Sequence, residues 1–133
     1  MKNLSIMIVG VGGQGTLLAS RVIGSAAVAA GLDVKVSEVH GMSQRGGSVE
    51  TYVKFGDKVH SPLVGKGEAD VIICFERLEA LRFAAYLKKD GILIVNEQVI
   101  DPMPVITGSQ KYPERIIEKL IEQLPQGRVV AFD

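Results

Sequence analysis

The stretch "NLSIMIVGVGGQGTLLASRVIGSAAVAA" (residues 3–30) decides the fold. Its apolar run at 3–9 is typical of a strand that is buried on both faces. Closely spaced glycines follow at 10–15, and residues 16–30 then have the length and composition of a helix that ends at Gly31. This order of strand, tight turn and helix predicts the first unit of an α/β sheet.

The rest of the chain continues the pattern. Further strands are predicted at 33–39, 48–55, 70–75, 92–96 and 127–132, with helices at 76–87 and 114–124 and a proline-punctuated loop at 98–113. Residues 48–55 alternate between apolar and polar side chains, which predicts a half-exposed strand that is antiparallel or at an edge. The sequence therefore predicts a Rossmann-like, doubly wound and mostly parallel sheet with helices on both faces, forming a single domain over 1–133.

Composition excludes several classes of partner. Fifteen basic and fifteen acidic residues cancel, so neither a nucleic acid nor a membrane surface is expected to bind this chain. The lone cysteine, Cys74, is expected to be a core thiol in a cytoplasmic protein, because it has no internal partner for a disulfide or a cluster. His40 and His60 are too few for a zinc site, so no metal site is predicted.

The glycine-rich turn is the first candidate site. In Gly10-x-Gly12-x-x-Gly15 the first glycine is expected to permit the turn, the second to admit a ligand's phosphates, and the third to let helix and strand pack closely. Glu38 stands about where a dinucleotide enzyme places its ribose-binding acid. Two interpretations stay open: a cofactor-binding turn that includes Gly13 and Gln14, or a structural or anion-accepting turn.

The stretch "HGMSQRGG" (residues 40–47) is the second candidate site. Arg45 can hold a carboxylate or a phosphate through two hydrogen bonds. The flanking glycines allow close backbone approach, and polar loops with little bulk tend to carry function. The stretch is either a tie at the end of the sheet or a partner- or anion-binding loop, whose members are His40, Gly41, Met42, Ser43, Gln44, Arg45, Gly46 and Gly47.

Catalytic residues are not predicted. Glu76 and Glu79 open a predicted helix, where the helix dipole favours acids, and this explanation is preferred over acid–base catalysis. The chain contains no recognisable nucleophile–base set, no thiamine diphosphate motif and no cysteines for an iron–sulfur cluster.

Four stretches in order carry a family resemblance: "IVGVGGQGTLLASRVIG", "SEVHGMSQRGGSV", "SPLV" with "GEADVIICFE", and "GILIVN". Together they resemble the gamma-type domain of 2-oxoacid:ferredoxin oxidoreductases, especially the indolepyruvate branch of that family. The resemblance covers nearly the whole chain, and the two glycine-rich motifs at this spacing are more specific than either motif alone.

The resemblance implies a noncatalytic subunit. In such an enzyme a 2-oxo acid is oxidatively decarboxylated, its acyl unit passes to coenzyme A, and electrons pass to ferredoxin. Thiamine diphosphate and the iron–sulfur clusters are expected on a partner subunit, so the isolated chain is expected to be inactive. Two alternatives stay open: an independent nucleotide-binding enzyme, or an assembly module without redox duty.

The end of the chain departs from the family pattern. Relatives continue beyond a strand similar to "GRVVAFD", so this chain is expected to be shortened at its C-terminus. A last strand without its cover leaves apolar surface or a sheet edge bare, which predicts self-association as a homodimer.

Overall fold

The computed structural model describes residues 3–40, 47–124 and 127–133. Its strands and helices follow the chain in this order: β1 Leu4–Val11, α1 Thr16–Ala29, β2 Asp33–His40, β3 Ser48–Gly56, β4 Ala69–Cys74, α2 Arg77–Phe83, the 3₁₀ turn η1 Ala84–Tyr86, β5 Leu87–Asn96, α3 Met103–Ile106, α4 Ile116–Gln123 and β6 Arg128–Phe132.

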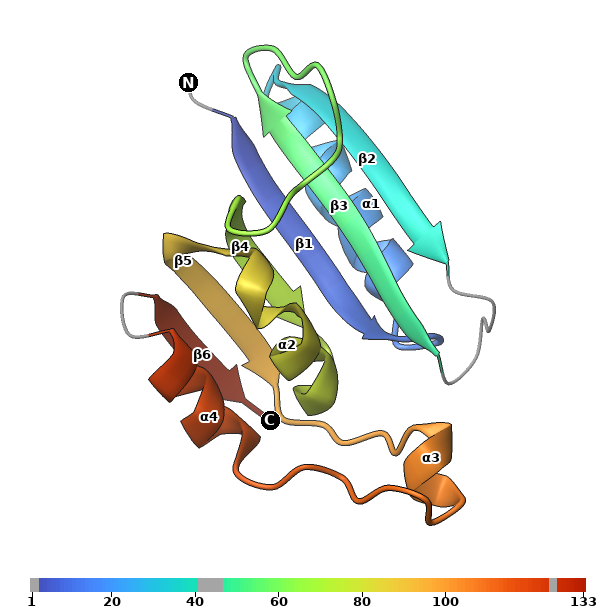
Figure 1. The fold of residues 1–133 in the computed structure, drawn as a ribbon. Coiled ribbons are helices and arrows are strands. Elements are labelled where there is room, and N and C mark those ends of the chain that lie inside the picture. Colours follow the sequence, from blue (N-terminus) through green and yellow to red (C-terminus); the bar gives the residue numbers. More distant parts are fainter. Residues whose placement is uncertain (1–2, 41–46, 125–126) are drawn as a thin grey trace.

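One six-stranded sheet runs through the molecule in the order β2-β3-β1-β4-β5-β6 (Figure 1). β1, β4, β5 and β6 pair in parallel, whereas β3 pairs antiparallel with both β1 and β2. The predicted α/β class and the mostly parallel sheet are confirmed, and so is the antiparallel direction of the strand at 48–55.

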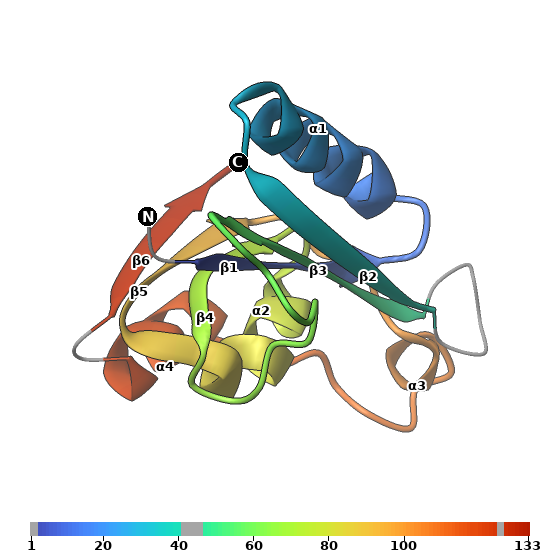
Figure 2. The same ribbon diagram turned by 90° about the horizontal axis from the view of Figure 1, so that it is seen from above.

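Helices cover the two faces of the sheet unequally (Figure 2). α1 lies on one face, over β1, β2 and β3, while α2 and α4 lie on the other. The alternation of side chains along β1 divides the core: Met7 and Val9 face α2 and α4, and Ile6 and Ile8 face α1. The central strand is therefore buried on both faces, as its continuous apolar sequence predicts.

β3 corrects one part of the sequence prediction. The strand is not half-exposed: it lies between β1 and β2, and both Tyr52 and Val53 are buried on opposite faces. Val53 packs under α1, whereas Tyr52 belongs to the other core together with Val64 from the 57–68 connection. The polar positions of this strand are explained by specific contacts, such as the hydrogen bond that the Lys54 ammonium donates to the Leu63 carbonyl.

Two segment boundaries also differ from the prediction. β5 begins at Leu87, so the predicted "KKDG" connection belongs to a strand. Leu87 pairs with Ala69 before the register shifts. Lys88 forms an ion pair with Asp70 at 2.9 Å. The predicted loop at 98–113 contains the short helix α3. Among the described residues, no helix is long and apolar enough to cross a membrane.

Candidate functional site

The glycine-rich turn joins the carboxyl end of β1 to the start of α1. Gly15 is the residue that caps α1, with φ 88°, and Gly13 also has a positive φ, 94°. L side chains rarely adopt this conformation, so the turn requires glycine at both positions. A Cβ atom at either position would meet no atom within 4 Å, so both face open space.

The predicted packing role of Gly15 is therefore wrong, and Gly10 has that role instead. A Cβ atom on Gly10 would lie 2.9 Å from Gln14 Oε1, 3.0 Å from Thr16 Cγ2 and 3.1 Å from Phe75 Cβ. Gly10 lies near the carboxyl end of β1, where the side chains of Gln14, Thr16 and Phe75 leave no room for a Cβ atom. The sequence pattern locates the glycines but does not distinguish a packing constraint from a backbone constraint.

Gln14 holds the turn in place. Its Oε1 accepts a hydrogen bond of 2.7 Å from the Val11 amide, and its Nε2 donates to the Phe75 carbonyl at 2.8 Å and to Gln98 Oε1 at 3.1 Å. One side chain thus connects the carboxyl end of β1 with the segments that follow β4 and β5. Its amide is engaged with the protein, so the part of the turn that faces outward is the backbone of Gly13 and Gly15.

The turn lies beside the start of β3. The Gly12 amide donates a 3.0 Å hydrogen bond to the Gly47 carbonyl, so the end of the second motif touches the first. A hollow of about 320 Å³ opens here, lined by Gly12, Gly13, Gly15, Thr16, Leu17, Val49 and Thr51. His40 is the last residue of β2 and Gly47 precedes β3, whereas the predicted loop residues 41–46 lie outside the described residues.

A second hollow, of about 280 Å³, adjoins the same end of the sheet and contains an acidic pair that the sequence analysis explained only by the helix dipole. Glu79 is 5% exposed; its Oε2 accepts a 2.5 Å hydrogen bond from the Ser48 hydroxyl, and its Oε1 lies 3.5 Å from Arg82 Nε. Burial raises the pKa of the Glu79 carboxyl, and the hydroxyl of Ser48 and the charge of Arg82 oppose this shift.

Glu76 is a structural acid. It is 1% exposed, caps α2 by accepting from the Glu79 amide at 3.0 Å, and also accepts from the Ile100 amide at 3.0 Å and the Tyr112 hydroxyl at 2.5 Å. The predicted position of Glu76 at the start of a helix is right, but its two long-range partners were not predicted. A buried carboxylate with three donors anchors the 98–113 segment to the sheet.

The other titratable candidates do not converge on the turn. Glu38 lies on β2, and β3 separates β2 from β1, so two strand spacings, about 9.6 Å, intervene where a dinucleotide site needs adjacent strands. Cys74 is 1% exposed and burial raises the pKa of its thiol, as expected for a core residue. Within 3–40, 47–124 and 127–133, no three acidic, histidine or cysteine side chains are grouped to hold a metal ion.

Comparison with known proteins decides the family. The model of the pyruvate ferredoxin/flavodoxin oxidoreductase family matches residues 5–130. The chain belongs to this family. The match spans both glycine-rich motifs and every strand and helix described above, apart from the first residue of β1 and the last two of β6.

Relatives within the family share most of the chain. The indolepyruvate oxidoreductase subunit IorB of Pyrococcus horikoshii is 49% identical over 134 residues, which cover 100% of this chain and 66% of that protein. IorB of Archaeoglobus fulgidus is 50% identical over 121 residues, which cover 91% of this chain and 59% of that protein. The chain thus matches 59–66% of the length of these relatives.

A solved structure shares the fold. The pyruvate oxidoreductase subunit PORC from Thermotoga maritima superposes with a TM-score of 0.69 at 22% identity, covering 100% of this chain and 63% of that one. At this level of identity the likeness concerns the fold, and it confirms the Rossmann-like class that the sequence predicts.

Proposed function

We propose that this chain is a noncatalytic subunit of a thiamine diphosphate-dependent 2-oxoacid:ferredoxin oxidoreductase that acts on indolepyruvate or another aryl pyruvate. The enzyme would oxidatively decarboxylate the oxo acid to an acyl-CoA and pass electrons to ferredoxin. Family membership and 49% identity to an indolepyruvate oxidoreductase subunit over the full chain support this assignment. Thiamine diphosphate and the iron–sulfur clusters would reside on a partner subunit.

The observation that carries the proposal is the convergence of the two motifs at one end of the sheet. The hydrogen bond from the Gly12 amide to the Gly47 carbonyl holds the glycine-rich turn against the start of β3. The side chains of Gln14 and Glu76 form hydrogen bonds within the chain. This rim is therefore suited to contact another molecule through backbone groups, and not to perform acid–base chemistry.

The turn fits a phosphate group. The first amides of a 14-residue helix lack partners within that helix, and the first turn of α1 contains no acidic residue to repel an anion. Gly13 and Gly15 add no side chain in front of these amides. We propose that this surface lies toward a phosphate of coenzyme A or thiamine diphosphate in the assembled enzyme, with Arg45 near by.

Strand order weighs against an independent nucleotide-binding enzyme. A dinucleotide site needs its ribose-binding acid on the strand next to β1, and here that neighbour is β3. An assembly module without redox duty differs from the proposed subunit only in whether turnover of the complex depends on this chain. The two are therefore tested on the complex.

The test is reconstitution. The chain is co-expressed with a candidate subunit that carries thiamine diphosphate and iron–sulfur clusters, and reduction of a viologen dye is measured with indolepyruvate and with other 2-oxo acids. We expect oxo acid-dependent and coenzyme A-dependent reduction by the complex and none by the chain alone. A partner subunit that binds this chain but turns over equally well without it would contradict the proposal and favour a role without redox duty.

Arg45 tests the second motif within the same assay. Arg45→Ala should weaken assembly, or raise the coenzyme A concentration needed for half-maximal rate, by roughly 10- to 100-fold, since a charge-assisted hydrogen bond contributes about 1.5–3 kcal/mol. The matched control is Arg128→Ala at the opposite end of the sheet, which should change neither. Loss of thermal stability in the isolated Arg45→Ala chain, with normal assembly and kinetics, would show that the motif ties the sheet together.

A further inference from the structure

The outer edge of β2 is the longest open edge of the sheet. β2 has eight residues, pairs with β3 along its whole length without a register shift, and stands last in the strand order. In the part of the chain that the structure describes, it therefore has a strand partner on one side only. β6, at the other edge, has five residues. Long, regular and partly apolar edges are ready templates for pairing with another chain.

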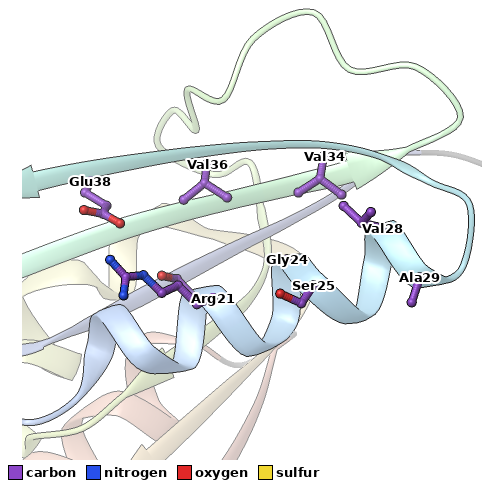
Figure 3. A pocket seen from close by; sticks show the side chains of 9 residues that line it. Arg21, Gly24, Ser25, Val28, Ala29, Val34, Val36 and Glu38 are labelled. Carbon is purple, nitrogen blue, oxygen red and sulfur yellow. The ribbon is translucent and has the colours of Figure 1, made fainter.

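A groove of about 600 Å³ runs beside this edge, between α1 and β2 (Figure 3). Val34 and Val36 point from the strand toward α1, and Val28 closes one end of the groove, while Arg21 and Glu38 lie at the other. Val36 is 44% exposed, because the helix residue beneath it is Gly24, whose missing Cβ would lie 3.7 Å from Val36 Cγ2. An apolar side chain in the middle of an open edge is thus left half uncovered.

We propose that a second copy of this chain pairs antiparallel with β2 across a twofold axis, so that two sheets join into one and Val36 lies at the axis. This interface is separate from the function proposed above and does not depend on it. It also differs from the homodimer expected from the sequence, which was assigned to the last strand.

Symmetry and charge select the register. A twofold axis perpendicular to the sheet keeps α1 of both copies on the same face, so each residue must oppose a partner residue whose side chain points to that face. An axis at Lys35 or at Glu38 would place two like charges directly opposite each other, which is destabilising. Axes at Val34 and at Val39 avoid this too, but they pair only a short part of the strand, so the axes that remain lie at Val36 and at Ser37.

Val36 is the better of these two axes. It places Val36 against the partner's Val36 and Lys35 against the partner's Ser37. An axis at Ser37 would instead place each half-exposed Val36 against the partner's Glu38, so that no apolar side chain would cover it. Each axis brings one pair of like charges into diagonal contact, Lys35 for the axis at Val36 and Glu38 for the axis at Ser37, and both side chains are exposed, so the apolar contact decides between them.

The two α1 helices leave room for this arrangement. α1 lies mainly over β3, so three strand spacings, about 14 Å, would separate the two helix axes. Packed helices approach to about 8–10 Å, so the copies meet without a clash. The space that remains is the two grooves joined, bordered by Arg21, Ser25 and Val28 of each copy.

Charge exchange at the axis tests the proposal. By analytical ultracentrifugation the unmodified chain should be in a concentration-dependent monomer–dimer equilibrium. Val36→Lys and Val36→Glu should each raise the dissociation constant at least tenfold, and an equimolar mixture of the two should recover a heterodimer. Ala131→Lys, on the exposed edge strand β6, is the matched control and should leave the equilibrium unchanged.

Cysteine cross-linking tests the register. Two Cα atoms directly opposite on antiparallel strands are about 4.5–5.5 Å apart, which suits a disulfide. Val36→Cys should therefore form a covalent dimer on mild oxidation. Val34→Cys should not, because Val34 opposes the partner's Glu38 and lies far along the strand from the partner's Val34. The native Cys74 is buried and should not react. A monomer at every concentration, a dimer broken only by Ala131→Lys, or efficient cross-linking at Ser37→Cys in place of Val36→Cys would each overturn the proposal as stated.

Discussion

The two halves of the sheet are built in different ways. The parallel half, β4, β5 and β6, packs large aliphatic side chains such as Ile72 and Leu93 against α2 and α4, and Leu120 of α4 is buried in the same core. The antiparallel half, β2 and β3 with the facing side of β1, meets α1 through small residues, including Ser20, Gly24 and Ala27. In the parallel half, large side chains and a buried carboxylate fill the space between sheet and helices. In the antiparallel half, a groove and an open strand edge remain.

This difference gives the two halves different roles: the parallel half stabilises the fold, and the antiparallel half offers surfaces for contact with other molecules. Glu76 and its donors fix the segments that follow β4 and β5, so the parallel half supports the fold. The antiparallel half presents the glycine-rich turn at one end and the α1–β2 groove along its edge. Changes in the parallel half should therefore affect thermal stability most, and changes in the antiparallel half should affect association.

Glu76→Ala should be the most destabilising of the substitutions in the parallel half. It leaves the buried Glu79 amide, the partly buried Ile100 amide and the Tyr112 hydroxyl without their acceptor, so we expect a loss of about 3–4 kcal/mol in the free energy of unfolding. Urea denaturation followed by circular dichroism measures it. Tyr112→Phe, which removes one of the three donors, should cost less than half as much; equal losses would mean that Glu76 acts through the tyrosine alone.

The turn between the halves distinguishes packing from backbone strain. Gly10→Ala should cost about 1–3 kcal/mol because its Cβ meets three atoms at 2.9–3.1 Å. Gly15→Ala should cost about 1–2 kcal/mol through its positive φ. Thermal melting measures both effects.

A second-site change tells the two causes apart. Thr16→Ser removes the Cγ2 atom that lies 3.0 Å from the Gly10 Cβ position, so it should partly rescue Gly10→Ala. The same change gives no relief to Gly15→Ala, whose Cβ meets nothing within 4 Å. Rescue of both variants, or of neither, would contradict this assignment.

Glu79→Gln tests how the buried carboxyl of Glu79 makes the stability of the chain depend on pH. Because burial raises the pKa of this carboxyl above its ordinary 4.5, the folded chain binds its proton more tightly than the unfolded chain does. Glu79 therefore lowers stability progressively as pH rises above 4.5 toward the folded-state pKa, and Gln removes that penalty. The variant should melt a few degrees above the unmodified chain at pH 7, and this difference should vanish at pH 4.

The control for the loss of one negative charge is Glu122→Gln, at an exposed position of α4. A melting difference that stays constant between pH 4 and pH 7 for Glu79→Gln would mean that its carboxyl does not change protonation on folding. The Arg82 contact adds little to either outcome, since Arg82 is 51% exposed.

Gly24→Ala should have the smallest effect, and it is stabilising. The added methyl lies at ordinary contact distance from Val36 and Val34, and alanine favours a helix interior by up to about 1 kcal/mol relative to glycine. Calorimetry should show a melting temperature higher by roughly 3–5 °C. Gly31→Ala, at φ 82°, is the contrasting variant and should lower it.

Local patterns predicted the elements but not how they meet. Apolar runs identified β1 and β4, and the length of the first helix was right to within one residue. The insertion of β3 between β1 and β2 was not predicted, because pairing Leu4 with Phe55 depends on segments about fifty residues apart, which no local period records. For the same reason the sequence could not show that β3 separates Glu38 on β2 from β1.

The candidate site was predicted in part. The glycine-rich turn was located, but the exchanged roles of Gly10 and Gly15 depend on dihedral angles and on contacts with Phe75. The partners of Glu76 come from residues 24 and 36 positions further along the chain, so only its capping position could be predicted. The interpretation of residues 41–46 as a partner- or anion-binding loop remains a prediction.

The position of β1 in the middle of the sheet has a consequence for synthesis on the ribosome. β1 is made first, yet its neighbours β3 and β4 end at Gly56 and Cys74. At about 5–20 residues per second, roughly 3–13 s pass between the completion of β1 at Val11 and the completion of β4 at Cys74. For most of that interval, until β3 is complete at Gly56, the uncharged and β-prone segment "LSIMIVGV" has neither partner, so the nascent chain should be most prone to aggregate, and most dependent on chaperones, before β3 and β4 are made.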